Sequence, residues 1–150
     1  MSRTIYVLNG PNLNLLGVRE PHLYGHATLN QAQALCEETT DALALGCDFR
    51  QTNHEGTLVD WVQEARERAA AVVINPAGLS FRSIPLLDAL KTLDQPIAEV
   101  HVTNIHRRDP LYQTSLVSKA ATGVICGFGV FGYAIAIRAL AHRLDAPAAT

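Results

Sequence analysis

The sequence predicts an α/β fold in which a parallel sheet is covered by helices on both faces. Short apolar runs bounded by turn residues, typical of buried strands, alternate with segments that repeat apolar residues at helical spacing. The chain has 150 residues, 48% of them hydrophobic and 17% charged, which suits a single compact domain. Repeated strand–helix alternation favours parallel strands joined by helical crossovers.

Five strands are expected in this sheet. The run Ile5-Tyr6-Val7-Leu8 is typical of a buried strand, Ala71-Val72-Val73-Ile74 is a similar apolar run, and the second strand has the mixed sequence CDFRQTN at 47–53. In order, the expected strands lie near residues 4–9, 47–53, 71–74, 97–102 and 123–126.

Four helical patterns follow strands. Thr28 and Gln31 have the spacing of a capping box at the start of the first helix, and Gly46 is expected to end it. The second helix is expected over 56–69, and a polar stretch over 104–114 is expected to hold a short helical turn. The apolar residues that mark the four helices are Leu29, Ala32, Leu35, Ala42 and Leu45; Leu58, Trp61, Val62, Ala65 and Ala69; Ile84, Leu87 and Leu90; and Tyr133, Ile137, Leu140 and Leu144.

Five strands in this length indicate a flavodoxin-like, doubly wound five-stranded parallel sheet, with one domain over 1–150 and a frayed tail over about 145–150. The net charge of −2 does not favour nucleic acid as a partner, and no apolar run approaches the roughly 18 residues of a membrane span. The first residues are expected to enter a strand without a secretory leader, so we expect a cytoplasmic protein. Cys36, Cys47 and Cys126 are expected to be reduced core thiols, and no metal site is expected.

Glu99 and His101 alternate on one face of a strand that should be buried. Because a buried charge without a partner is costly, the two side chains are expected to pair. A carboxylate beside a histidine orients the imidazole and favours its protonated form, which prepares a general acid. A purely structural pair is the other interpretation of the same pattern.

The loop over 10–25 carries reactive side chains, among them Arg19 and Tyr24. Long loops of this kind often act as lids or binding loops. Tyrosine has a reference pKa of about 10, and a nearby guanidinium helps it act as a base by stabilising the phenolate. A surface arginine and a tyrosine packed under the loop form the alternative.

The glycines of the GxGxxG pattern over 127–132 are expected to allow close packing of a helix on a strand. A dinucleotide site would also need a following strand with an acidic residue about 20 positions on, and the sequence stops before that.

Taken together, these residues resemble the type II 3-dehydroquinate dehydratase family along nearly the whole chain. The matching segments are LNGPNLN at 8–14, GVREP at 17–21, Tyr24-Gly25, QTNHEG at 51–56, Asp60-Trp61, Ile74-Asn75-Pro76, Asp88-Ala89, EVHVTN at 99–104, Arg108, Gly123-Val124-Ile125 and Phe131-Gly132-Tyr133. The resemblance implies a flavodoxin-like fold, no metal ion or organic cofactor, and a homo-oligomer that is a dodecamer built from trimers.

The resemblance also implies catalytic roles in the dehydration of 3-dehydroquinate to 3-dehydroshikimate, a step of the shikimate and quinate pathways. Tyr24 would remove a proton beside the ketone, and Arg19 would stabilise its phenolate. Asn12 would help stabilise the enolate, with a water as one bridge. His101, oriented by Glu99, would protonate the departing hydroxyl.

By the same resemblance, Asn75 and Arg108 would bind the substrate together with the backbone at Val102 and Thr103. Asp88 would act across a subunit boundary, so that a neighbouring subunit completes each site.

Two positions depart from the family pattern. The family usually has histidine where this chain has Phe81 and arginine where it has Tyr112, and both contact ring hydroxyls of the substrate. The Phe81 side chain forms no hydrogen bonds, and Tyr112 lacks the charged, two-pronged guanidinium of an arginine. Arg82 is a candidate to supply the missing contacts. Two alternatives therefore stay open: a paralogue that dehydrates a related cyclic β-hydroxy ketone, and a non-catalytic flavodoxin-like binding module.

Overall fold

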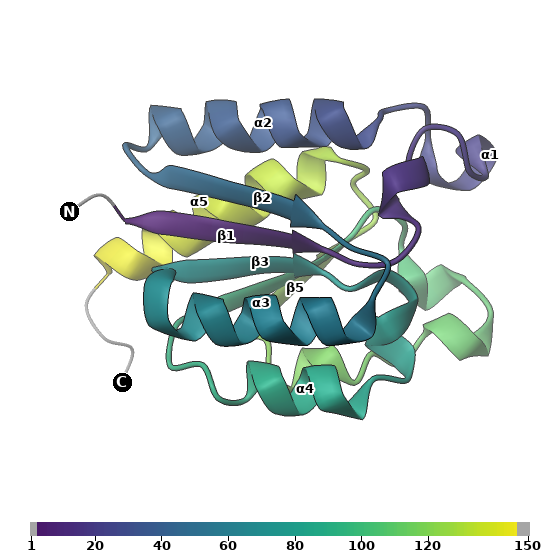
Figure 1. Cartoon of the computed structure of the whole chain (residues 1–150). Helices are drawn as coiled ribbons and strands as arrows, with labels where there is room; N and C mark the ends of the chain where they lie inside the picture. The colour runs from purple at the N-terminus through teal and green to yellow at the C-terminus, as the bar shows by residue number, and fades with distance from the viewer. Residues whose placement is uncertain (1–2, 147–150) are drawn as a thin grey trace.

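The structure, a computed structural model, describes residues 3–146 and is an α/β fold built on one five-stranded sheet (Figure 1). All neighbouring strands are parallel, and their order is β2-β1-β3-β4-β5. This topology confirms the single-domain flavodoxin-like class that the sequence predicts. The strands are β1 (Thr4–Asn9), β2 (Gly46–Gln51), β3 (Ala71–Asn75), β4 (Ile97–His101) and β5 (Gly123–Cys126).

Helices cover both faces of the sheet, as expected (Figure 1). Side chains alternate along a strand, so neighbouring residues of β1 enter different cores: Val7 packs on the side of α2 and α5, and Leu8 on the side of α3 and α4. Both residues are fully buried. The long helices are α2 (Leu29–Ala42), α3 (Glu55–Arg68), α4 (Ile84–Leu90) and α5 (Phe131–Asp145).

The first of these helices begins where the sequence predicts and ends earlier. Thr28 and Gln31 form the expected capping box. The helix ends at Ala42, and Ala44 rather than Gly46 takes the left-handed conformation, with φ of 57°. Gly46 is instead the first residue of β2. The prediction that Gly46 ends the helix is therefore wrong, because Gly46 belongs to β2 and pairs with Thr4 of β1.

Short helical turns interrupt the two polar stretches. The loop over 10–25 holds a 3-10 turn and the short helix α1 (Pro21–Tyr24), and the stretch over 104–114 holds two turns where one was expected. Turns this short span too few positions to show a helical period, so sequence patterns do not reveal them. The 3-10 turns are Leu13–Leu15, Ala77–Phe81, Ile105–Arg107, Pro110–Tyr112 and Val117–Lys119.

The glycine-rich loop between β5 and α5 needs glycine for its backbone conformation and for one close approach, since a Cβ on Gly127 would lie 3.1 Å from Asn104 Cβ. Gly127 and Gly129 have φ of 95° and 62°, a region that side chains other than glycine rarely adopt. A Cβ on Gly132 would lie 3.5 Å from Val100 Cγ1, which is ordinary contact. The expectation of close helix–strand packing therefore fails for Gly132, and backbone conformation explains Gly127 and Gly129.

The three cysteines are unpaired, as expected, but only Cys36 is buried. Cys47 and Cys126 are half-buried, which corrects the prediction that all three lie in the core. Burial raises the pKa of the Cys36 thiol well above its usual range and that of Cys47 to about 11, so both thiols stay protonated near neutral pH.

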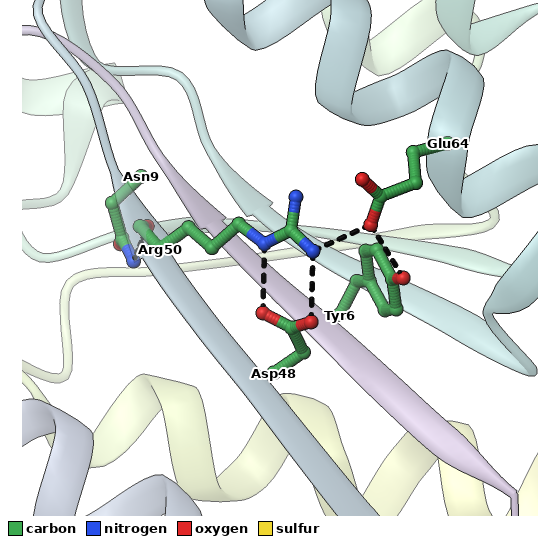
Figure 2. A network of polar contacts seen from close by, with 5 residues as sticks. All are labelled: Tyr6, Asn9, Asp48, Arg50 and Glu64. Atoms are coloured by element: carbon green, nitrogen blue, oxygen red, sulfur yellow. Dashed lines mark hydrogen bonds and ion pairs between the residues drawn. The ribbon is translucent and has the colours of Figure 1, made fainter.

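A polar network braces the outer strand β2 against α3 (Figure 2). Arg50 donates two hydrogen bonds to Asp48, at 2.8 and 2.9 Å, and a third to Glu64 on α3. The Tyr6 hydroxyl donates to the same Glu64 oxygen at 2.7 Å. The hydrogen bonds from Arg50 and Tyr6 lower the pKa of Glu64 from 4.5 to about 2, so this carboxylate stays ionised even in mild acid.

The two ends of the described chain meet. Arg3 forms an ion pair with Asp145, the last residue of α5, at 2.9 Å. Fraying was expected from about residue 145, but Asp145 is held here and 147–150 lie outside the described residues. Among residues 3–146, no helix is long and apolar enough to cross a membrane.

Candidate active site

A cleft of about 260 Å³ lies beyond the carboxyl ends of the central strands, where ligands bind in sheets of this type. All but two of the site residues expected from the sequence line it; Glu99 and Asp88 do not. The lining residues are Pro11, Asn12, Leu13, Arg19, Tyr24, Asn75, Ala77, Gly78, Phe81, His101, Val102, Thr103, Ile105, Arg108 and Tyr112.

The floor of the cleft forms where the chain leaves β1 and β3. Gly10 donates its amide hydrogen to the carbonyl of Asn75 at 2.8 Å, and a Cβ at Gly10 would lie 2.5 Å from the carbonyl oxygen of Pro76. Only glycine therefore permits this approach. Asn12 and Ala77, which follow the two strand ends, both have positive φ, at 71° and 52°. Such strain in residues other than glycine is common where a site is being shaped.

Tyr24 projects into the cleft from α1 between two guanidinium groups. Arg108 donates a hydrogen bond to the Tyr24 hydroxyl at 3.0 Å. Arg19 lies over the Tyr24 ring, 5.0 Å from its centroid, and contacts Glu20 at 3.4 Å. The expected pairing of Arg19 with Tyr24 is therefore present as a cation–π contact, while the arginine on the hydroxyl is Arg108, which the sequence had suggested as a substrate-binding residue.

His101 and Glu99 pair as the alternation along β4 predicts. His101 is 5% exposed and Glu99 is fully buried, and the Nε2 atom of His101 bonds to a Glu99 carboxylate oxygen. Ser118 donates to the other Glu99 oxygen at 2.6 Å. Burial alone would raise the pKa of Glu99, but the hydrogen bonds from His101 and Ser118 outweigh burial and hold it below the usual range. The bond at Nε2 leaves Nδ1 of His101 as the free ring nitrogen.

Asn75 is held in place by a buried tyrosine. Its Nδ2 donates to the hydroxyl of Tyr133 at 3.0 Å, and that hydroxyl donates to Asn9 Oδ1 at 2.6 Å. Asn75 Oδ1 accepts from the amide of Ala77 at 3.2 Å. One amide hydrogen of Asn75 stays available, so the side chain reaches the cleft in a fixed orientation.

Phe81 and Tyr112 form an aromatic wall on one side of the cleft. The Phe81 ring stacks on His101 with centroids 6.2 Å apart and meets the Tyr112 ring edge-on at 5.4 Å. Arg108 lies over the other part of this wall, 4.1 Å from the Tyr112 centroid. The two departures from the family pattern thus contact each other, and each also contacts a polar residue of the cleft.

Two residues considered from the sequence lie away from the cleft. Asp88 is exposed on α4, and Arg82 is exposed beside Phe81; neither lines the cleft. Arg82 therefore does not fill the place of the missing polar contacts in this conformation.

Three residues that support the site were not among the site residues expected from the sequence. Ser118 bonds Glu99, Tyr133 bonds Asn75, and Asn53 Oδ1 accepts from the amide of Asn12 at 2.9 Å. Asn53 ends an expected strand, which is a usable signal. Ser118 lies in the 3-10 turn Val117–Lys119 and Tyr133 on an apolar face of α5, where the sequence offers no such signal.

No group of three or more His, Cys, Asp or Glu side chains that could hold a metal ion occurs among residues 3–146. The polar side chains that line the cleft belong to two arginines, two tyrosines, one histidine, two asparagines and one threonine. This set suits proton transfer to and from a small polar molecule.

Comparison with known proteins agrees with this chemistry. A model of the family described as dehydroquinase class II matches residues 3–141. The 3-dehydroquinate dehydratase of Phenylobacterium zucineum is 52% identical over 141 residues, covering 94% of this chain and 97% of that protein. The 3-dehydroquinate dehydratase 2 of Pseudomonas aeruginosa is 49% identical over 148 residues, covering 99% of this chain and all of that protein.

A solved structure is also similar. The type II dehydroquinase of Propionibacterium acnes superposes with a TM-score of 0.90 at 43% sequence identity. The match covers 94% of this chain and 97% of the other.

Proposed function

This chain belongs to the class II dehydroquinase family, and from that premise we propose that it converts 3-dehydroquinate to 3-dehydroshikimate with Tyr24 as base and His101 as acid. It is a hydro-lyase, as its relatives' name of 3-dehydroquinate dehydratase states. The observation that carries the assignment of roles is that Tyr24 and His101 line one cleft, each bonded to a charged partner.

In the first step the Tyr24 phenolate takes a proton from the carbon beside the ketone. The electrons of the broken C–H bond move to the ketone oxygen and form an enolate. The guanidinium of Arg108 at the hydroxyl, and that of Arg19 over the ring, favour the phenolate before the step. Asn12 at the cleft floor stabilises the negative charge on the enolate oxygen.

In the second step the enolate returns its electrons, a carbon–carbon double bond forms, and the bond from the β-carbon to its hydroxyl breaks. Hydroxide leaves readily only when it is protonated, and the His101 imidazolium supplies that proton, so that water departs. The Glu99 carboxylate supports this role because it is buried, ionised and bonded to the imidazole. Tyr24 then releases its proton and His101 regains one, which restores the site.

Substrate binding is assigned to the remaining lining groups. The free amide hydrogen of Asn75 and the backbone at Val102 and Thr103 face the cleft as hydrogen-bonding partners for a carboxylate and hydroxyls. Phe81 and Tyr112 supply the wall against the ring. The product belongs to the shikimate pathway of aromatic amino acid biosynthesis, and the three free cysteines fit a reducing cytoplasm.

Asp88 is assigned a role in a neighbouring subunit's site. It is exposed and does not line its own chain's cleft, which fits a residue donated across a boundary. The resemblance to the family implies a homo-oligomer, a dodecamer built from trimers, in which such sharing occurs. The altered-substrate paralogue and the binding module gain no support from the comparisons.

The test is an assay of the purified protein with 3-dehydroquinate, following the ultraviolet absorbance of the conjugated enone product. We expect turnover in the wild type and a loss of about a thousandfold in Tyr24→Phe, since positioned acids and bases contribute on that order. Tyr6→Phe, which removes a hydroxyl far from the cleft, serves as the matched control. A Tyr24→Phe variant with near-normal rate would refute the mechanism, and a wild type inert on 3-dehydroquinate would refute the substrate.

A further inference from the structure

We propose that Tyr112 is a positioning residue that holds the guanidinium of Arg108 against the Tyr24 hydroxyl. Arg108 contacts both tyrosines. Its guanidinium carbon lies 4.1 Å from the Tyr112 ring centroid, and its Nη1 atom lies 3.0 Å from the Tyr24 hydroxyl oxygen. The inference rests on the proposed role of Tyr24 as base.

Arg108 needs such a support because no carboxylate fixes it. Among residues 3–146, no ion pair includes Arg108. Its guanidinium instead lies between two rings, that of Tyr112 at 4.1 Å and that of Tyr24 at 5.5 Å. A long, unpaired arginine side chain loses considerable rotamer freedom when it is fixed, and an aromatic face on one side offsets that cost without neutralising the charge.

Tyr112 is itself well placed to act as this support. It ends the 3-10 turn that begins at Pro110, and its amide donates to the Asp109 carbonyl at 2.9 Å. Phe81 meets its ring edge-on at 5.4 Å. The turn fixes the backbone of Tyr112, the Phe81 ring packs against its side chain, and Arg108 lies over its ring.

An uncharged support has an electrostatic consequence. A carboxylate in this place would hold Arg108 equally well but would cancel the positive charge that the phenolate needs, whereas the ring leaves it intact. Among residues 3–146, the charged and titratable groups around Tyr24 are Arg19, which is paired with Glu20, then Arg108, and His101 and Tyr112 in the same cleft, with Arg107 in an adjoining groove. Arg108 is the one bonded to the hydroxyl, so displacing it should change the phenolate most.

The experiment compares the pH profiles of kcat/KM for the wild type, Tyr112→Leu and Tyr112→Phe. We expect the ascending limb of Tyr112→Leu to move toward alkaline pH by about one pH unit, with a loss of about tenfold in kcat/KM near neutrality. Tyr112→Phe keeps the aromatic ring, so the ascending limb of its pH profile should lie at the same pH as in the wild type. Leu111→Ala, an exposed neighbour in the same turn, is the control.

Two outcomes would overturn the proposal. A raised KM in Tyr112→Leu with an unmoved limb would mean that Tyr112 contacts only the substrate. An equal shift in Tyr112→Phe would mean that the hydroxyl acts and the ring does not. In an Arg108→Met background, Tyr112→Leu should move the limb no further; a second full shift there would also contradict positioning through Arg108.

A titration that does not use turnover separates this inference from the proposed function. The ultraviolet absorbance of tyrosinate is followed in the wild type and in Tyr112→Leu, each minus its Tyr24→Phe counterpart, so that only Tyr24 contributes. Tyr6 and Tyr133 interfere little, because burial raises the pKa of Tyr6 to about 12 and that of Tyr133 further. If Tyr24→Phe stays active, the mechanism fails, but a later onset of tyrosinate in Tyr112→Leu would still support positioning, and an unchanged onset would refute it.

Discussion

Arg108 donates a hydrogen bond to the Tyr24 hydroxyl at 3.0 Å, although the two residues are 84 positions apart in the sequence. Arg19, only five positions before Tyr24, lies over the ring at 5.0 Å. The charge that faces the phenolic oxygen therefore comes from the turn after β4, and the loop that carries the tyrosine contributes a second charge at its ring.

Arg108→Met should consequently reduce kcat/KM more than Arg19→Met. A hydrogen bond to a charged form contributes about 1.5–3 kcal/mol, and an exposed cation–π contact about 0.5–1 kcal/mol. We expect losses of about tenfold to a hundredfold for Arg108→Met and about tenfold or less for Arg19→Met, measured with 3-dehydroquinate. Arg66→Met, on the far side of α3, controls for net charge. The reverse order of the two losses would contradict the assignment.

Variants of Glu99 and Ser118 test whether the Glu99–His101 pair contributes to the reaction rate or only to stability. Glu99→Gln removes the buried charge beside the imidazole, and we expect kcat to fall by about a hundredfold. Ser118→Ala removes one of the donors to Glu99 and should cost about 1 kcal/mol of stability with a loss of rate of only a few-fold. Thr114→Ala, an exposed position on the same segment, is the comparison. Equal rates for Glu99→Gln and wild type would show that the pair is structural only.

The network around Glu64 predicts sensitivity to acid (Figure 2). The pKa of Glu64 is about 2 in the folded protein against 4.5 ordinarily, so its stabilisation is fully present above pH 4.5 and is lost as the pH falls toward 2. Between these values the Tm of the wild type should fall more steeply than that of Glu64→Gln. Glu67→Gln, which alters an exposed carboxylate on the same helix, should follow the wild type. Parallel slopes for wild type and Glu64→Gln would contradict the network's role.

Asp88 allows a test of shared sites by subunit mixing. Asp88→Asn and Tyr24→Phe should each be nearly inactive alone. If Asp88 serves a neighbouring cleft, dissociating, mixing and reassembling the two variants should recover up to about a quarter of wild-type activity, because some sites then receive both intact residues. Light scattering checks that a large oligomer has re-formed. An assembled mixture that stays inactive, or an active monomer, would exclude the sharing.

The sequence by itself determined the elements whose signals are local. Apolar runs marked the buried strands β1, β3 and β4, and the capping box of Thr28 and Gln31 marked the start of α2. The Glu99–His101 pair was also visible, because residues two apart on a strand must share a face. In each case the physical cause operates within a few residues of the chain.

Only the tertiary structure decided which groups meet in the cleft. Arg108 on Tyr24, Ser118 on Glu99 and Tyr133 on Asn75 join residues from separate elements. Such contacts depend on how the crossovers return the chain to the same edge of the sheet, and neither periodicity nor composition encodes the final approach of two side chains. The fold follows from local patterns, but the partners of each reactive group follow from packing.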